Sequence, residues 1–161
     1  MIFVTIGTQE PFDRLIKAVD EIAATIQEEE VIAQTSESAY VVQHMKTVAF
    51  LSPVEFNKLF DEARLIVSHA GMGTVISALT KQKPILVMPR RASLGEHRND
   101  HQMASAKKLH ELNFIHVAYD EEELKEKILA LIEAGDPQPL HHLGEWASDE
   151  LIQSLQKFVH P

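Results

Sequence analysis

Short apolar segments alternate along the chain with longer segments in which apolar residues recur every three or four positions. Residues 2–6 form the first apolar segment, and Phe12, Leu15, Ile16 and Val19 begin a series with helical spacing. A short apolar run rich in β-branched residues favours a strand, and apolar residues repeated with the helical period favour an amphipathic helix. The chain is therefore predicted to begin with a strand followed by a helix.

The same order recurs through most of the chain. Further strands are predicted at residues 31–34, 47–51, 65–68, 85–88 and 115–117, and further helices at residues 53–61, 73–81, 100–112 and 121–133. Alternation of this kind predicts a Rossmann-like α/β fold, with a mostly parallel sheet and helices on both of its faces. The continuous apolarity of the strands agrees, because a strand covered on both faces has no polar side.

Two segments are harder to interpret. The pattern weakens between Gln34 and Thr47, where residues 40–42 form either a short strand or part of a loop. After a turn or linker at residues 135–139, a last helix is predicted at about residues 144–159, because apolar residues recur there at helical spacing. These are Leu151, Ile152, Leu155, Phe158 and Val159. Packing on the chain's own sheet is the commoner outcome, and packing on a partner is the alternative. We expect one domain over residues 1–161.

Composition narrows the classes of function. The formal net charge of −9 argues against nucleic acid as a partner, because phosphate backbones are bound by clustered Lys and Arg. It also disfavours direct docking on anionic lipid. No stretch approaches the ~18 apolar residues of a membrane span, and the first residues lack the features of a signal peptide. We therefore expect a cytoplasmic domain without membrane insertion, and the lack of cysteine removes thiolate and Cys-zinc chemistry.

The segment 65–74 carries the most informative motif, because an apolar strand there runs into a glycine-spaced turn that opens a helix. Gly71 and Gly73 would let a ligand approach the backbone closely, and free N–H groups at a helix start stabilise phosphate. Thr74 adds a hydroxyl and His69 a hydrogen-bond donor. A plainer interpretation is that the glycines only serve a tight turn. The motif gains weight because other polar loops also follow predicted strands.

Ligands of doubly wound sheets bind beyond the carboxyl ends of the strands, and three more polar segments are predicted there. They are Gly7-Thr8-Gln9, Ser52, and Arg90-Arg91 with the following Glu96, His97, Asp100 and Gln102. The basic pair would lie near a diphosphate, and carboxylate and amide groups would accept hydrogen bonds from sugar or ribose hydroxyls. Helix capping by Asn99 or Asp100 is the structural alternative. A metal site built on His97, His101 and Asp100 is a less favoured one, because the pattern is not His-Glu-x-x-His.

Several motifs together resemble a known family. They are Val4-Thr5-Ile6-Gly7-Thr8 with Phe12-Asp13 and Leu15-Ile16, then residues 68–74, then Lys83-Pro84-Ile85, and then Pro89-Arg90 with Gly95-Glu96-His97 and Asn99-Asp100-His101-Gln102. Over nearly its whole length the chain resembles the donor-binding domain of glycosyltransferase family 28. It is similar to small bacterial exopolysaccharide subunits of the PssE or EpsE type. More distantly, it resembles the catalytic subunit of the eukaryotic two-part UDP-GlcNAc transferase of the dolichol pathway.

The resemblance implies a GT-B glycosyltransferase in which this domain holds a UDP-sugar. A membrane-anchored partner subunit would then bind the lipid-linked saccharide acceptor, and transfer would invert the anomeric centre. By position, Gly7 and Thr8 would approach the donor, His69 with Gly71, Met72, Gly73 and Thr74 would hold the diphosphate, and Glu96, Asp100 and Gln102 would contact sugar and ribose. Relatives often carry a ribose-binding glutamate where this chain has Ser77, so that contact would pass to Glu96 or Asp100. A second departure is Thr35-Ser36, where relatives often have a glycine.

Glycosyl transfer requires stabilisation of the leaving diphosphate and deprotonation of the acceptor. The helix start at Gly71, with His69 and Arg90 or Arg91, is predicted to stabilise the diphosphate without a metal ion or other cofactor. We expect the main base on the partner, with His97 and Glu96 as weaker candidates. Two other classes stay open: a metal-dependent hydrolase using His97, His101 and Asp100, and a non-catalytic nucleotide-binding scaffold.

Overall fold

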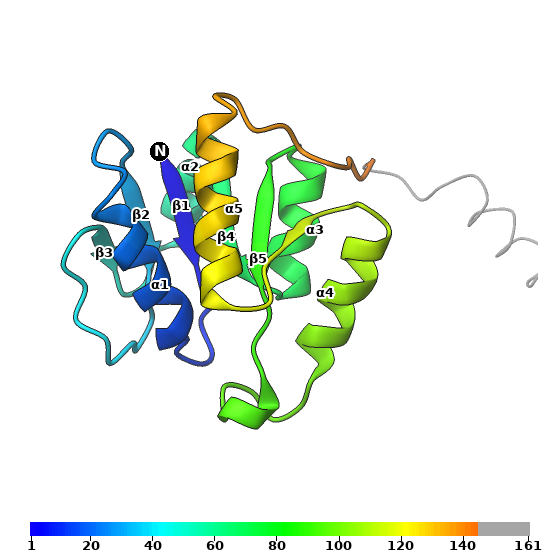
Figure 1. Ribbon diagram of the computed structural model, residues 1–161, viewed down its shortest axis with the longest axis horizontal. Helices are drawn as coiled ribbons and strands as arrows, with labels where there is room; N and C mark the ends of the chain where they lie inside the picture. Colours follow the sequence, from blue (N-terminus) through cyan, green and yellow to red (C-terminus); the bar gives the residue numbers. More distant parts are fainter. Residues whose placement is uncertain (145–161) are drawn as a thin grey trace, which may run out of the picture.

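The computed structural model of the chain describes residues 1–144, which form a layered α/β domain (Figure 1). The strands are β1 (Ile2–Thr5), β2 (Val31–Gln34), β3 (Lys46–Val48), β4 (Leu65–His69), β5 (Ile85–Met88) and β6 (His116–Val117). The helices are α1 (Asp13–Ala23), α2 (Pro53–Glu62), α3 (Met72–Thr80), α4 (His101–Glu111) and α5 (Glu121–Glu133), with a 3-10 turn, η1 (Ala92–Leu94). The predicted fold class is confirmed, and the predicted helix at about 144–159 lies outside the described residues.

The sheet has six strands in the order β3-β2-β1-β4-β5-β6, and every neighbouring pair is parallel. The chain starts at the centre with β1, builds outward to β3, and returns to the other side of β1 with β4. This is the strand order of a doubly wound Rossmann sheet, and the reversal lies between β1 and β4. Because the strands are parallel, their carboxyl ends lie at one edge of the sheet.

Alternate side chains of the central strands β1, β4 and β5 enter two separate cores. Ile2 and Val4 of β1 belong to a core that includes residues of α1 and α5, whereas Phe3 belongs to one that includes residues of α2, α3 and α4. The ring of Phe3 meets that of Phe56 on α2 edge-on, at a centroid distance of 5.3 Å, a favoured aromatic geometry. The sheet is therefore covered on both faces (Figure 1). No helix within residues 1–144 is long and apolar enough to cross a membrane.

The edge strand β3 differs from the prediction, which extended it over residues 47–51. Its partner β2 ends at Gln34, and Gln34 pairs with Val48, so the ladder has no regular partner beyond that point. Lys46 and Thr47 are exposed, as befits an edge strand, and an exposed strand lacks the packing that makes an apolar run decisive. The prediction of the strand was correct, and that of its carboxyl end was wrong.

Residues 40–42 belong to a loop, and a buried carboxylate on α1 holds it. Asp20 accepts hydrogen bonds from the Tyr40 hydroxyl at 3.0 Å, from the backbone N–H of Gln43 at 3.0 Å and from that of His44 at 2.7 Å. Asp20 is only 1% exposed, and a buried carboxylate is tolerated when its oxygens are bonded in this way. The loop backbone thus donates hydrogen bonds to a carboxylate of α1 and does not pair with the sheet.

Candidate functional site

A pocket of about 340 Å³ opens at the carboxyl edge of the sheet, where β1 and β4 end. Of the residues predicted to form a site, it brings together Gly7, Thr8, His69, Gly71, Gly73, Thr74, Arg90, His97 and Gln102. These residues come from the loop after β1, the turn from β4 into α3, and the segment from β5 into α4. The pocket therefore lies at the reversal of strand order, where doubly wound sheets bind their ligands.

The imidazole of His69, at the end of β4, forms one wall of the pocket and lies between two glycines. A Cβ atom on Gly7 would come within 3.1 Å of the ring, and one on Gly71 would overlap it, at 2.7 Å from Cε1. Gly7 also has φ of +77°, in the left-handed region that favours glycine. Gly71 has an ordinary extended conformation, so its lack of a side chain makes room for the ring rather than for a turn.

The charge of His69 is controlled by its surroundings. Burial, followed by the positive charge of Arg90, lowers the pKa of His69 to about 4. The Ser68 hydroxyl lies 3.2 Å from Nδ1. At neutral pH the ring is therefore uncharged, and it offers the pocket one N–H donor or one acceptor according to its tautomer.

The amino end of α3 offers backbone donors to the pocket. The first bond within the helix runs from the N–H of Val75 to the carbonyl of Gly71 at 3.1 Å, so the N–H groups before Val75 have no partner inside the helix. Gly71 has no side chain to cap them. A Cβ atom on Gly73 would meet nothing within 4 Å, so this helix start faces open space. Free amides with the helix dipole behind them favour an anion.

Arg90 supplies the positive charge of the pocket. It is 4% exposed, and its Nη2 atom donates to the carbonyls of Ile6 at 3.0 Å and Glu10 at 2.6 Å. Its Nε atom is buried and has no hydrogen-bond partner among the described residues. Burial lowers the pKa of Arg90 in spite of the carboxylates of Glu10 and Glu96, but an arginine remains charged in proteins. A buried guanidinium beside free helix amides indicates a site for an anionic group.

Gln102 and His97 complete the side of the pocket that comes from β5 and α4. The side-chain oxygen of Gln102 accepts from the backbone N–H of Arg90 at 3.2 Å, which fixes the start of the segment after β5. Nδ1 of His97 lies 3.1 Å from the carbonyl of Asn99. The backbone N–H of Asn99 also lies 3.4 Å from the same Nδ1. A carbonyl only accepts and an N–H only donates, so the two contacts favour opposite tautomers and do not fix the proton of His97.

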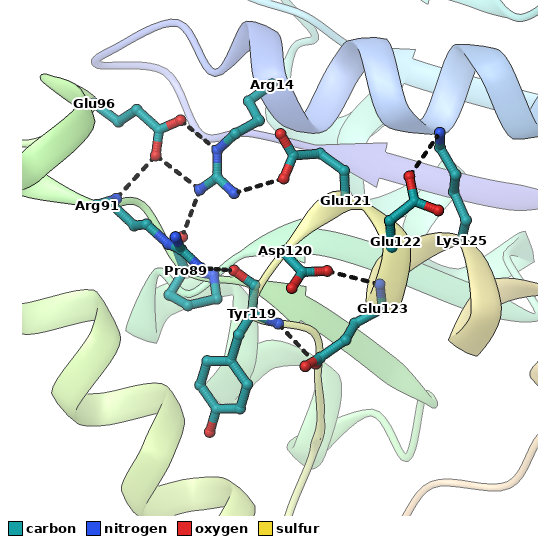
Figure 2. A network of polar contacts seen from close by, with 10 residues as sticks. All are labelled: Arg14, Pro89, Arg91, Glu96, Tyr119, Asp120, Glu121, Glu122, Glu123 and Lys125. Carbon is teal, nitrogen blue, oxygen red and sulfur yellow. Dashed lines mark hydrogen bonds and ion pairs between the residues drawn. The ribbon is translucent and has the colours of Figure 1, made fainter.

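Some predicted residues do not line the pocket. Both oxygens of Glu96 bind Arg14, at 2.6 and 2.9 Å (Figure 2), and Asp100 accepts from the backbone N–H of Ala92 at 2.9 Å. Ser52 caps α2 in a reciprocal arrangement with Glu55, and Met72 is the exposed first residue of α3. The hydroxyl of Ser77 donates to the carbonyl of Gly73 in its own helix at 2.9 Å, so its proton is already used.

Sequence reasoning missed Ile6 and Glu10 as lining residues, and it placed Gln9 in a polar loop at the site without giving it a role. Among the residues that line the pocket, Glu10 is the only one with a carboxylate. The signal for it was its place in the polar loop directly after the first strand. That loop was assigned to the site through Gly7, Thr8 and Gln9.

The structure gives no support to the metal-dependent hydrolase. Within residues 1–144, no group of three His, Cys, Asp or Glu side chains is placed to hold a metal ion. Asp100 is bound to Ala92, and His97 is bound to the carbonyl of Asn99. Two of the three residues of that hypothesis therefore have separate local partners.

Solved structures place the fold among the domains of GT-B glycosyltransferases. The solution structure of ALG13 aligns with a TM-score of 0.59 and 20% identity, over 96% of this chain and 93% of that one. The crystal structure of Acinetobacter baumannii MurG aligns with a TM-score of 0.58 and 20% identity, over 97% of this chain and 49% of that one. At this identity the alignments establish the fold alone.

Sequence comparison establishes the family. The profile of the glycosyltransferase family 28 C-terminal domain matches residues 1–141, and the chain belongs to that family. The UDP-N-acetylglucosamine transferase subunit ALG13 of Mus musculus is 29% identical over 118 residues. That match covers 67% of this chain and 10% of the mouse protein, so the chain spans only a small part of the length of this relative.

Substitutions at the two glycines of the turn should have opposite effects on stability. Gly71→Ala should lower the free energy of unfolding by about 1–3 kcal/mol, because the His69 ring is confined by Gly7 on its other side and cannot move away freely. Gly73→Ala should leave it unchanged or raise it by up to about 1 kcal/mol, because its Cβ meets open space and alanine favours the helix. Urea unfolding measures both, and equal effects would contradict the assigned packing.

His69 should make stability depend on pH. Its folded pKa of about 4 lies below the ordinary histidine value of 6.5, so between these values the unfolded chain binds a proton that the folded chain does not. Relative to His69→Asn, the wild-type free energy of unfolding should therefore fall by about 3 kcal/mol as the pH drops from 6.5 to 4. Urea titrations at several pH values test this, and parallel curves for the two proteins would refute it.

Proposed function

We propose that this chain is the UDP-sugar-binding subunit of an inverting glycosyltransferase that transfers a hexosyl or N-acetylhexosaminyl group. The observation that carries the proposal is the pocket in which Arg90, His69 and the start of α3 converge at the reversal of strand order. Family membership supports the reaction class. The name of the mouse relative, a UDP-N-acetylglucosamine transferase subunit, favours UDP-GlcNAc as one donor to test.

In the proposed complex, the diphosphate occupies the space in front of Gly73. The free amides of α3 and the guanidinium of Arg90 stabilise the charge that develops as the glycosidic bond to the diphosphate breaks. His69 is neutral at physiological pH, so it contributes a hydrogen bond rather than a second positive charge. Thr8, Thr74 and Gln102 provide polar groups around the same pocket, and we propose that they contact the donor, together with Gly7.

The acceptor must lose a proton as the new bond forms, and we propose that the main base lies on a partner. His69 is poorly suited to this role because its pKa of about 4 makes it a weak base. Glu96 is bound on both oxygens by Arg14. His97 lines the pocket, so it is the candidate base that this chain itself offers.

The proposed partner is a membrane-anchored subunit that binds a lipid-linked saccharide acceptor. The relative is named a subunit, which favours placing the acceptor-binding half on another polypeptide. We place the pair at the cytoplasmic face of a membrane, in the synthesis of exopolysaccharide or of another lipid-linked saccharide. This chain would be inactive or weakly active alone.

A second candidate is a nucleotide-binding scaffold that transfers no sugar. One observation favours it: the position at which relatives hold ribose with a carboxylate carries Ser77, whose hydroxyl is bonded to the carbonyl of Gly73. This position therefore offers no charged acceptor for the ribose hydroxyls. Glu96 and Asp100, to which this task could pass, also bind other groups of the chain. In this case the chain would bind UDP and yet support no transfer with any partner.

Binding of UDP should depend on the open space at Gly73. Gly73→Asp should weaken UDP binding on the order of 100-fold or more, because a carboxylate would stand where the diphosphate binds. Gly73→Asn is the matched control, since it adds similar bulk without charge and should cost less. Titration calorimetry measures affinity, and circular dichroism should show an intact fold for both. Wild-type affinity in Gly73→Asp would move the diphosphate elsewhere.

Transfer should require both subunits. The chain, co-expressed with a membrane-anchored acceptor-binding subunit, should transfer sugar from at least one of UDP-GlcNAc, UDP-glucose and UDP-galactose to a lipid-linked saccharide. Each subunit alone should show little or none, and Gly73→Asp in the complex should be inactive. UDP binding without transfer in any such complex would support the scaffold instead.

A further inference from the structure

Arg90 and His97 lie on the segment 89–97, and the side chain of Arg14 on α1 binds this segment. Arg14 donates through Nε to one oxygen of Glu96 at 2.6 Å and through Nη2 to the other at 2.9 Å (Figure 2). Nη2 also donates to the carbonyl of Pro89 at 3.2 Å. Arg14 therefore binds this segment at two points. One is the carbonyl of Pro89, just before Arg90, and the other is the carboxylate of Glu96, just before His97.

Glu96 closes the same segment on itself. Its second oxygen accepts from the backbone N–H of Arg91 at 2.9 Å (Figure 2), so the carboxylate joins the beginning of the segment to its end. Both Arg14 and Glu96 are nearly buried, with side-chain exposures of 12% and 13%. Burial acts to lower the pKa of Arg14, but the bonds to Glu96 and the weaker pair with Glu121 outweigh it and raise that pKa. The pair is thus charged, bidentate and largely screened from water.

Phe12 links the pair to the pocket. The guanidinium of Arg14 lies 5.4 Å from the centroid of the Phe12 ring, and that of Arg90 lies 5.0 Å from the same centroid. Both distances are within the range of cation–π attraction, and Phe12 is 1% exposed. A displacement of Arg14 would therefore also displace Arg90, both through the packed ring of Phe12 and through the backbone.

We propose that Arg14 and Glu96 are positioning residues of the donor site. They fix residues 89–97 so that Arg90 and His97 meet the diphosphate and the sugar without rearranging. This inference rests on the proposed function, and it gives Glu96 a different role from direct contact with the sugar. A pair that only stabilised the fold would change the free energy of unfolding and leave the affinity of the folded protein for UDP unaltered.

The variants that test the pair are Glu96→Gln, Arg14→Met, the double variant, and Arg14→Lys, which keeps the charge but not the planar fork. The matched control is Lys125→Met, because Lys125 joins α5 to α1 through Glu21 at 2.6 Å and pairs with Glu122 (Figure 2). Within residues 1–144 it makes no hydrogen bond or ion pair with residues 89–97. For each full-length protein, UDP affinity is measured by calorimetry and stability by thermal unfolding. NMR reports hydrogen exchange of the Arg91 amide and the imidazole resonances of His97.

Glu96→Gln and Arg14→Met should each weaken UDP binding about tenfold. The double variant should bind UDP about as tightly as the weaker-binding single variant, because both changes remove the same contact. Arg14→Lys should retain part of the affinity, and exchange at Arg91 should accelerate wherever affinity falls. Lys125→Met should bind UDP as the wild type does, whatever its stability.

Wild-type affinity in Glu96→Gln and Arg14→Met, or losses that simply multiply in the double variant, would overturn the inference. So would altered affinity with unchanged Arg91 exchange and unchanged His97 resonances, since the segment would then not have moved. Failure of the proposed function has a different signature. In that case the wild-type protein itself would not bind UDP, and the positioning role would fall with it.

Discussion

The site depends on the parallel pairing of β1 with β4 at the centre of the sheet. Thr5 pairs with Ser68. Gly7, two residues beyond Thr5, and His69, one residue beyond Ser68, therefore lie near each other at the carboxyl ends of the two strands, although 62 positions separate them in the sequence. A slip of one residue would turn every side chain of a strand to the opposite face. The two different cores on either side of the sheet forbid such a slip. The register that buries Ile2 and Phe3 correctly therefore also assembles the pocket.

The glycines of this site serve two different purposes. Gly7 and Gly71 make room for the ring of His69, and Gly73 alone faces open space. The ring in turn is shielded enough to remain neutral, which suits a group that lines a pocket with Arg90. Gly73, beside the free backbone amides of α3, thus serves a different purpose from Gly7 and Gly71, which make room for the imidazole of His69. A glycine-spaced motif contains both functions and does not distinguish them by itself.

The central strands were predictable because strands buried on both faces are mostly apolar, and β4 and β5 each contain an apolar run. The carboxyl end of the edge strand β3 was not predictable, since it is set by the length of its partner β2. The pocket was predicted as far as topology determines it, through loops that follow strands. The orientation of Glu96 was not predictable, because its partner Arg14 lies 82 positions earlier. The dense polar run around it offers no sign of which side chains turn inward.

Charge illustrates how a global property and a local site can differ. The chain has a formal charge of −9. This charge opposes association with a nucleic acid, because a nucleic acid places many phosphates along the protein surface. A single diphosphate interacts mainly with the charges close to it, because salt screens exposed charges beyond about 8 Å at physiological ionic strength. In the pocket those surroundings are the buried guanidinium of Arg90 and the helix start at Gly73, where screening is weaker. An acidic protein can therefore exclude nucleic acid and still hold a nucleotide, provided that its positive groups are few, buried and fixed in place.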